Sequence, residues 1–540
     1  MAAGTLMDKF VCAVDVGTGS ARAGIFDGAG RLAGRAEHPI LLSRPSPAMA
    51  EHDSEDIWAA ACAAVRGALE KSGVAPQAVA GIGFDATCSL VVRGPDGRQV
   101  TVSETGEARW DTISWLDHRA LAEADECTVS GHRVLDHVGG VMSPEMQVPK
   151  LMWLKRHLPR SWDSAGYFFD LTDFLTFRAS GSSARSQGTL TCKWTYLAHE
   201  DDGWQRDFFE VVGVPDILER GRLPERPVPG GTDLGPLTPE AAAGLGLTTG
   251  CRVAAGLIDA YAGALGVFAG HAGNGDDLDR RLALIAGTSS CVMSMTATPR
   301  RFAGGWGPYY GAALPDLWLS EGGQSATGAL LDHVIRWHGA AGEPDAETHR
   351  RIAARITALR EAGKLDGERR LHVLPDFHGN RSPFADPHAT GVISGLTLDA
   401  SFDSLCRLYW RSCVGIALGV RHILDSLEGA PGQVDTLHIT GGHTRNPIMM
   451  SLYADATGCS IAETAEDEAV LLGTAMLAAA AAGLYPTLRD TCAGMRQPAR
   501  VTHPDPAARE SFTRDYQIFL EMHKHRKVLD ALSAGANPPA

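Results

Sequence analysis

Asp15-Val-Gly-Thr-Gly-Ser-Ala-Arg22 is a glycine-rich turn between two apolar segments, and this stretch decides the fold. Residues 10–16 (FVCAVDV) precede the turn and residues 21–26 (ARAGIF) follow it, and both segments predict short strands. Glycines allow successive backbone N–H groups to point together at an anion, and Thr18 and Ser20 add hydroxyl donors. The stretch therefore predicts either a phosphate cradle or an ordinary hairpin turn.

The same design returns about 270 residues later. An apolar segment at 282–286 (LALIA) leads into Gly287-Thr-Ser-Ser290, and a second apolar segment follows at 291–295. This second turn is a weaker signal alone, but two equivalent turns in two halves indicate a duplication. The pattern predicts an α/β protein of two similar domains that face each other across a cleft.

Two such turns on opposite walls can hold the β- and γ-phosphates of one ATP molecule. Arg22 can neutralise phosphate charge, and Asp15 at the end of its strand can hold Mg²⁺ through water. The sequence contains no G-x-x-x-x-G-K-[ST] loop, so any ATP is held without that motif.

Composition gives the expected domains. We expect an N-terminal domain at 9–268, a C-terminal domain at 280–500 and a terminal helix at 505–533. The polar run 270–281 (GHAGNGDDLDRR) is the expected boundary between the two domains. The terminal helix can pack on the body of the chain or on a second copy, which leaves a homodimer open.

Charge and cysteine content exclude several classes of partner. The 540 residues include 49 Lys and Arg against 64 Asp and Glu, and the net charge of −15 argues against nucleic acid. The longest apolar stretch, 475–484, has about half the length that a spanning helix needs, so no membrane partner is expected. No secretory signal is visible, and eleven cysteines without a C-x-x-C pair indicate reduced thiols in the cytoplasm.

These motifs resemble those of the FGGY carbohydrate kinases, which have an actin-like (ribonuclease H-like) ATPase fold. The resemblance extends from about residue 10 to residue 484 and includes the DVGTGSAR turn. Its other motifs are GFDATCS at 83–89, WLDHR at 115–119, GLIDAYAGALG at 256–266, GTSS at 287–290, EGGQSATG at 321–328 and TGGHTRNP at 440–447. Within the family, GFDATCSLVV, CKWTY, GGQS and PDFHGNRSP are most similar to the D-ribulokinase branch, whose naming overlaps with that of ribitol kinases.

The resemblance implies that Asp259, in GLIDAYAG, is the catalytic base that takes the proton of the acceptor hydroxyl. From the residues alone, an aspartate that caps a helix is an equal interpretation. With Asp15, Asp259 is also expected to hold Mg²⁺ through water.

The resemblance also implies a sugar pocket. Lys193 and Glu321 match family positions that bind ribulose hydroxyls, where one donates and the other accepts a hydrogen bond. The alternatives are a solvated lysine and a structural ion pair. Asp85 and Ala86 are expected to line the pocket. Trp115, Asp117 and Arg119, in the run 115–119, are expected near the sugar pocket. The alternative is that they have a structural role at the end of a strand.

The resemblance implies an ATP site built from both glycine-rich turns and from the glycine pair at 441–442. Gln324 can touch either ligand. The expected ATP-binding residues are Gly17, Thr18, Gly19, Ser20, Arg22, Gly287, Thr288, Ser289, Gln324, Gly441, Gly442 and Asn446. The chain departs from the family at His443 and Arg445, where a glycine and a lysine are usual. The larger side chain of His443 is expected to alter the contacts with adenosine.

The combined expectation is an ATP-dependent kinase that phosphorylates the terminal 5-hydroxyl of D-ribulose, with ATP and Mg²⁺ as its cofactors. L-ribulose, ribitol and D-xylulose are alternative substrates within the family. An alternative from another class is a non-catalytic, nucleotide-switched binding protein of the same fold. The presence of Asp15, Asp259, Lys193 and Glu321 together favours the kinase.

Overall fold

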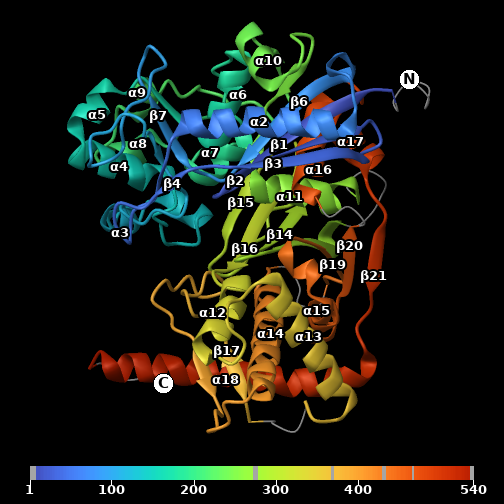
Figure 1. Ribbon diagram of the computed structural model, residues 1–540. Coiled ribbons are helices and arrows are strands. Elements are labelled where there is room, and N and C mark those ends of the chain that lie inside the picture. Colours follow the sequence, from blue (N-terminus) through green and yellow to red (C-terminus); the bar gives the residue numbers. More distant parts are fainter. Residues whose placement is uncertain (1–7, 272–277, 366–369, 429–432, 465–467, 536–540) are drawn as a thin grey trace.

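The computed structural model describes residues 8–271, 278–365, 370–428, 433–464 and 468–535. Each half of the chain builds one large mixed sheet, and the two sheets lie one above the other with helices between and around them (Figure 1).

The first sheet has the spatial order β10-β11-β6-β1-β2-β3, and the short strand β12 also pairs with β6. Buried apolar residues fill most of β1 and β6, as expected for strands at the centre of a sheet. Its strands are β1 (Phe10–Val16), β2 (Ser20–Asp27), β3 (Leu32–Pro39), β6 (Val79–Ala86), β10 (Asp233–Pro236), β11 (Arg252–Ala254) and β12 (Leu257–Ile258).

The second sheet has the order β15-β16-β14-β13-β19-β20-β21. Its strands are β13 (Arg281–Ala286), β14 (Ser290–Thr296), β15 (Trp306–Tyr310), β16 (Trp318–Gln324), β19 (Thr436–Thr440), β20 (Ser460–Thr464) and β21 (Ala499–Thr502).

The two sheets share one core topology. In the first, β1 pairs with β2 in antiparallel fashion and with β6 in parallel fashion, and β3 extends the sheet beyond β2. In the second, β13 pairs with β14 in antiparallel fashion and with β19 in parallel fashion, and β16 extends the sheet beyond β14. The repeated connectivity confirms the predicted duplication of an α/β unit.

Two helices cross between the sheets. Helix α11 (Asp259–Phe268) follows the first sheet in the chain but contacts β13 and β19, whereas α16 (Ala469–Ala481) follows β20 but packs on β1 and β6. The apolar stretch at 475–484 begins inside α16, which starts earlier, ends at Ala481 and is buried over most of its length. Because α11 and α16 also pack tightly on each other, they join the two halves.

Smaller elements surround the first sheet. A five-stranded sheet with the order β4-β5-β8-β7-β9 consists of β4 (Leu42–Ser43), β5 (Glu51–His52), β7 (Leu90–Arg93), β8 (Thr112–Ile113) and β9 (Tyr167–Asp170). The helices of this half are α2 (Ser54–Ser72), α3 (Leu121–Val129), α4 (Gln147–His157), α5 (Pro159–Ser164), α6 (Leu171–Ser180), α7 (Gln187–Lys193), α8 (Arg206–Val211), α9 (Ile217–Gly221) and α10 (Pro239–Leu245).

In the described residues, the second half of the chain has six further helices, of which α17 packs on α16 beside the first sheet. They are α12 (Gly328–His338), α13 (Ala346–Glu361), α14 (Phe402–Asp425), α15 (Pro447–Thr457), α17 (Leu488–Met495) and α18 (Arg509–Ser533), and β17 (His372–Leu374) forms a hairpin with β18 (Val392–Ser394). The terminal helix α18 lies along the body of the chain, against α14, α15 and β17 (Figure 1).

Two further expectations concern compartment and domain boundary. All eleven cysteines are free, and ten of them are buried. Among the described residues, no helix combines the length and the apolar character needed to cross a membrane. Of the predicted boundary run 270–281, residues 272–277 lie outside the described part of the chain.

Candidate active site

The first glycine-rich turn joins β1 to β2. It is closed by the Gly17 amide, which donates to the Ser20 carbonyl oxygen at 3.0 Å. The Thr18 hydroxyl oxygen accepts a hydrogen bond from the Trp115 indole at 2.9 Å, so the 115–119 run contacts the turn. Gly19 is exposed at the tip of the turn.

The second turn joins β13 to β14 and is closed one residue earlier than the first, with the Gly287 amide donating to the Ser289 carbonyl oxygen at 2.8 Å. The carbonyl oxygens of Gly287 and Thr288 accept hydrogen bonds from the start of α12. In a trans peptide the N–H points away from the C=O, so the amides that follow these carbonyls point away from α12. That orientation suits an anion over the turn.

A carboxylate pair lies beside the first turn. Asp15 and Asp85 are direct neighbours across β1 and β6, and both are buried. The Arg22 guanidinium contacts the Asp15 carboxylate at 2.7 Å, and Thr474 of α16 donates its hydroxyl hydrogen bond to Asp85. Burial raises the pKa of Asp15 to about 6 and raises the pKa of Asp85 well above its usual range.

The phosphate side thus has two carboxyl groups against one guanidinium, and the negative charge is in excess when both carboxyl groups are ionised. Buried carboxylates that exceed their cationic partners favour a further cation. Asp85 is expected in the sugar pocket; the structure places it next to Asp15, and its part in the pocket stays a prediction.

Asp259 is the first residue of α11, directly after β12. Its carboxylate accepts a hydrogen bond from the Ala260 amide at 2.7 Å. Removal from water raises the pKa of Asp259, while the charges of Arg22 and Lys193 lower it. Asp259 therefore lies within electrostatic reach of both the phosphate side and the sugar side.

A second group of charges surrounds Trp306. Lys193 ends α7 and is buried, and its ammonium lies 4.1 Å from the centre of the Trp306 ring. The guanidinium carbon of Arg381 lies 4.5 Å from the same centre. Both distances are typical of cation–π contacts.

Acidic residues complete this group. The Arg381 guanidinium contacts the Glu321 carboxylate at 2.7 Å, and Glu145 lies 3.8 Å from the Lys193 ammonium. Cys291 donates its thiol hydrogen to Glu321 at 3.3 Å. The structure thus brings Lys193 and Glu321 to one aromatic ring, although they come from different halves of the chain.

Trp306, Arg381 and Glu145 are not among the residues predicted for the site. Arg381 lies inside the PDFHGNRSP run, so that run is the signal that could have found it. Trp306 and Glu145 carry no local signal, because only the packing of distant segments brings them to Lys193.

The residues of the 115–119 run have two different environments. Arg119 makes several hydrogen bonds to Asp117 and contacts Glu51 at 2.8 Å, and all three side chains are buried. This closed network fits the structural interpretation of Asp117 and Arg119. Trp115 alone reaches the phosphate turn.

The glycine pair Gly441-Gly442 follows β19. Gly441 has a φ of 100°, and a Cβ there would lie 2.4 Å from the Ala286 carbonyl oxygen, so this position requires glycine. Gly442 is exposed beside it. His443 is buried against Tyr453, with 2.8 Å between its Nδ1 and the tyrosine hydroxyl, so its bulk points into the core.

The remaining predicted nucleotide residues have partners within the protein. The Asn446 amide nitrogen donates to the Tyr409 hydroxyl at 3.2 Å, and its carbonyl oxygen caps α15. Gln324 donates to the Ile416 carbonyl oxygen at 3.2 Å and faces α14.

Ala86, which is expected in the sugar pocket, lies at the end of β6 and is fully buried opposite Ile258.

Two family models match the chain. The N-terminal domain model of the FGGY family of carbohydrate kinases matches residues 10–266, and the C-terminal domain model matches residues 282–482. The chain belongs to the FGGY family of carbohydrate kinases. It is a carbohydrate kinase, as the resemblance of its motifs implies.

Related FGGY proteins match over most of their length. The FGGY carbohydrate kinase domain-containing protein of Homo sapiens is 41% identical over 540 residues, covering 96% of this chain and 97% of the relative. The D-ribulokinase of Saccharomyces cerevisiae is 36% identical over 513 residues, covering 88% of this chain and 72% of the relative.

Solved structures support the fold. The ligand-bound xylulose kinase of Lactobacillus acidophilus superposes with a TM-score of 0.78 at 19% identity, covering 96% of this chain and 98% of the other. The glycerol kinase of Plasmodium falciparum with ADP gives 0.75 at 14% identity, covering 95% and 98%. These likenesses confirm the two-domain, actin-like architecture.

Proposed function

We propose that this carbohydrate kinase transfers the γ-phosphoryl group of ATP to the terminal 5-hydroxyl of D-ribulose, with Asp259 as general base. The observation that carries the proposal is the place of Asp259, which is half-buried and interacts with both Arg22 and Lys193. The 36% identity to a D-ribulokinase favours D-ribulose as the sugar.

In the proposed reaction, Asp259 orients the 5-hydroxyl and accepts its proton as the oxygen attacks the γ-phosphorus. The new O–P bond forms while the bond to the β–γ bridging oxygen breaks, and ADP leaves. Partial burial raises the pKa of Asp259, which makes its carboxylate a better proton acceptor. Phosphoryl transfer depends mainly on positioning and charge neutralisation, so a moderate base suffices.

The phosphates are proposed to bind the two turns. Gly17–Ser20 and Gly287–Ser289 supply backbone and hydroxyl donors, and Arg22 supplies a positive charge. Gly441, Gly442 and Asn446 are proposed to border the adenosine.

Mg²⁺ fits the excess of carboxylates beside the first turn. In the described residues no set of three acidic, histidine or cysteine side chains could enclose a metal ion. We therefore propose that Asp15 and Asp259 would hold Mg²⁺ through water when ATP is bound. When bound, Mg²⁺ neutralises charge on the transferring phosphoryl group.

The sugar is proposed to lie between Lys193 and Glu321. The lysine donates to hydroxyl oxygens, and the glutamate accepts from hydroxyl groups. Both are buried and already oriented, by Trp306 and Arg381 respectively. A site of buried polar groups disfavours sugars that leave these groups without partners.

Replacing Lys193 tests the sugar side. For Lys193→Ala we expect the KM for D-ribulose to rise about 10- to 100-fold, because a buried cation that contacts hydroxyl groups is lost. The KM for ATP stays within about twofold. Lys155→Ala is the matched control, since Lys155 pairs with Asp216 at the surface. Steady-state kinetics with an unchanged D-ribulose KM would remove Lys193 from the pocket.

A coupled ADP-release assay over D-ribulose, L-ribulose, ribitol, D-xylulose and glycerol tests the proposed substrate. We expect the highest kcat/KM for D-ribulose. A higher value for another of these compounds would contradict the choice of sugar, and turnover of none would contradict the proposed function.

The free cysteines favour the cytoplasm as the proposed compartment. ATP and the sugar are the only partners proposed, and the division into 9–268, 280–500 and 505–533 stays a prediction.

A further inference from the structure

Helix α18 carries buried charge, although it lies beyond both segments that match the family models. Its apolar residues Phe512, Tyr516 and Phe519 pack on the body, but the same face continues with His523 and Arg526, each 3% exposed. In the described part of the chain, no nitrogen of the Arg526 guanidinium makes a hydrogen bond. A buried charge of this kind is costly unless acidic partners are close.

Two acidic partners lie in the loop between β17 and β18, and a third, Asp530, lies on α18 itself at 4.0 Å from Arg526. Arg526 lies 3.8 Å from the Asp376 carboxylate and 3.9 Å from that of Asp386. His523 lies 3.6 Å from Asp376. Burial is the main cause that lowers the pKa of His523 to about 3, and neighbouring positive charges lower it further. Arg526 therefore supplies the positive charge at neutral pH.

The loop itself is tightly bonded around these contacts. Asp376 accepts a hydrogen bond from the Asn380 amide at 3.0 Å, and the backbones of Asn380 and Asp386 exchange two hydrogen bonds of 2.8 Å. The Lys527 ammonium lies 3.9 Å from the centre of the Phe384 ring. Ala385 is held at a φ of 49°, a strained conformation that persists only where surrounding contacts impose it.

The other side of the loop faces the sugar-side charges. Arg381 contacts Glu321 at 2.7 Å, and the Ser382 hydroxyl oxygen accepts a hydrogen bond from the Gly323 amide of β16 at 3.3 Å. The loop therefore connects α18 directly to the strand that carries Glu321.

We propose that α18 positions the sugar-binding carboxylate, with Arg526 and His523 acting as positioning residues through the 376–386 loop. Arg526 holds Asp376 and Asp386, and the His523 ring packs edge-on against Phe384 with 5.0 Å between the ring centres. The loop then fixes Arg381, and Arg381 orients the Glu321 carboxylate. Displacement of a binding group by about 1 Å is enough to lower activity strongly. The part of the proposal that concerns sugar rests on the proposed function, whereas the hold of α18 on the loop does not.

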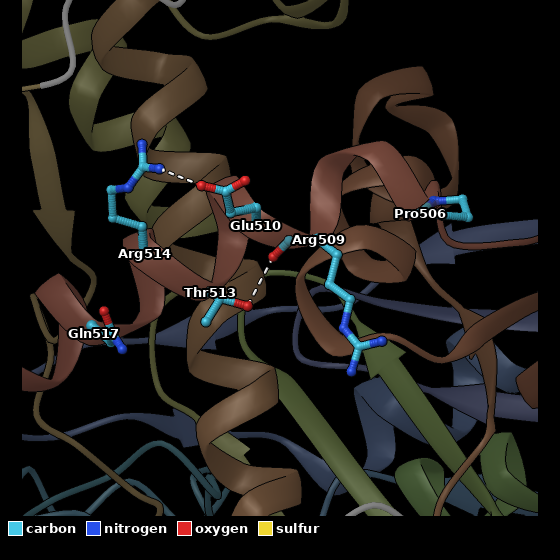
Figure 2. Close-up of a pocket in the computed structure, with 6 residues that line it drawn as sticks. All are labelled: Pro506, Arg509, Glu510, Thr513, Arg514 and Gln517. Carbon is cyan, nitrogen blue, oxygen red and sulfur yellow. Dashed lines mark hydrogen bonds and ion pairs between the residues drawn. The ribbon is translucent and has the colours of Figure 1, made fainter.

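The test compares Arg526→Met with Arg526→Lys and with a control on the same helix. Arg514→Ala is the control, because Arg514 lies on the exposed face and pairs with Glu510 at 3.0 Å. Figure 2 shows these residues at a shallow surface pocket that the first turns of α18 line with Pro506. The full-length protein is used throughout.

Two readouts are measured, and the first needs no substrate. Hydrogen–deuterium exchange of the 376–386 loop and of β16 should accelerate in Arg526→Met, return toward wild type in Arg526→Lys, and stay unchanged in Arg514→Ala. The KM for D-ribulose should rise about 10- to 100-fold in Arg526→Met while the KM for ATP stays within about twofold.

Each outcome decides between support and rejection. Unchanged exchange in the folded Arg526→Met variant would overturn the proposal, and so would faster exchange with an unchanged KM for the sugar. If Arg526→Met does not fold, His523→Gln takes its place under the same criteria. If wild type phosphorylates no sugar, the proposed function fails, and exchange of the loop and of β16 alone decides whether α18 holds them.

Discussion

Replacing Asp259 with asparagine is expected to lower kcat by about 10²- to 10⁴-fold, the usual contribution of a general base. Asparagine keeps the shape and can still accept the Ala260 amide hydrogen bond through its oxygen, but it cannot take a proton at neutral pH. ATP affinity should stay close to wild type, because the phosphate turns remain intact and the asparagine oxygen can still accept a hydrogen bond from a water bound to Mg²⁺. Single-turnover kinetics and calorimetric titration with ATP check the two parts separately.

The control for Asp259→Asn is an aspartate that only caps a helix. Asp345 precedes α13 and accepts the Thr348 amide at 2.8 Å, so Asp345→Asn changes a helix start without touching the site. Its kcat should match wild type. A kcat within about threefold of wild type for Asp259→Asn would reduce Asp259 to the capping role that the residues alone also allow.

Replacing Gly266 with alanine is expected to destabilise the protein by about 1–3 kcal/mol or more, the range for overpacking a tight core. A Cβ at Gly266 would lie 2.0 Å from the Ala469 carbonyl oxygen, and one at Gly473 would lie 1.8 Å from that of Ala262. Because these neighbours are backbone atoms of α11 and α16, the two helices must separate. The free energy of unfolding from urea titration measures the cost.

Gly263→Ala on the same helix is the matched control. Its Cβ would meet a flexible side-chain carbon of Ile285 at 3.3 Å, and alanine in a helix interior gains about 0.5–1 kcal/mol over glycine. Gly263→Ala should therefore be close to neutral or stabilising. Equal stability of the two variants would contradict the tight crossing of α11 and α16.

The large features of the fold could be predicted from the sequence because their signals are local. The two strand–turn–strand segments, at 10–26 and 281–295, each consist of an apolar stretch, a turn rich in small residues and a second apolar stretch. This pattern can be recognised within a short stretch of sequence. The crossing of α11 and α16 could not be predicted in this way, since each helix packs on the sheet of the other half. Apolar residues show that a helix is buried but not which surface buries it.

The same distinction applies to the site. Lys193, Asp259 and Glu321 lie in motifs that the resemblance identifies, and the structure places them near one another. Arg381 and Trp306 complete the sugar side only through contacts between distant segments. The sequence also does not show that Asp85 lies next to Asp15, because this register follows from the pairing of β1 with β6.

The most direct test of the account is to identify the product. The protein is incubated with ATP, Mg²⁺ and D-ribulose labelled with ¹³C at carbon 5, and ³¹P and ¹³C NMR spectra are recorded. We predict one new phosphomonoester coupled to carbon 5, formed in equal amount to ADP and lost in Asp259→Asn. Release of ADP with inorganic phosphate and no phosphorylated sugar, or a phosphate on another carbon, would contradict it.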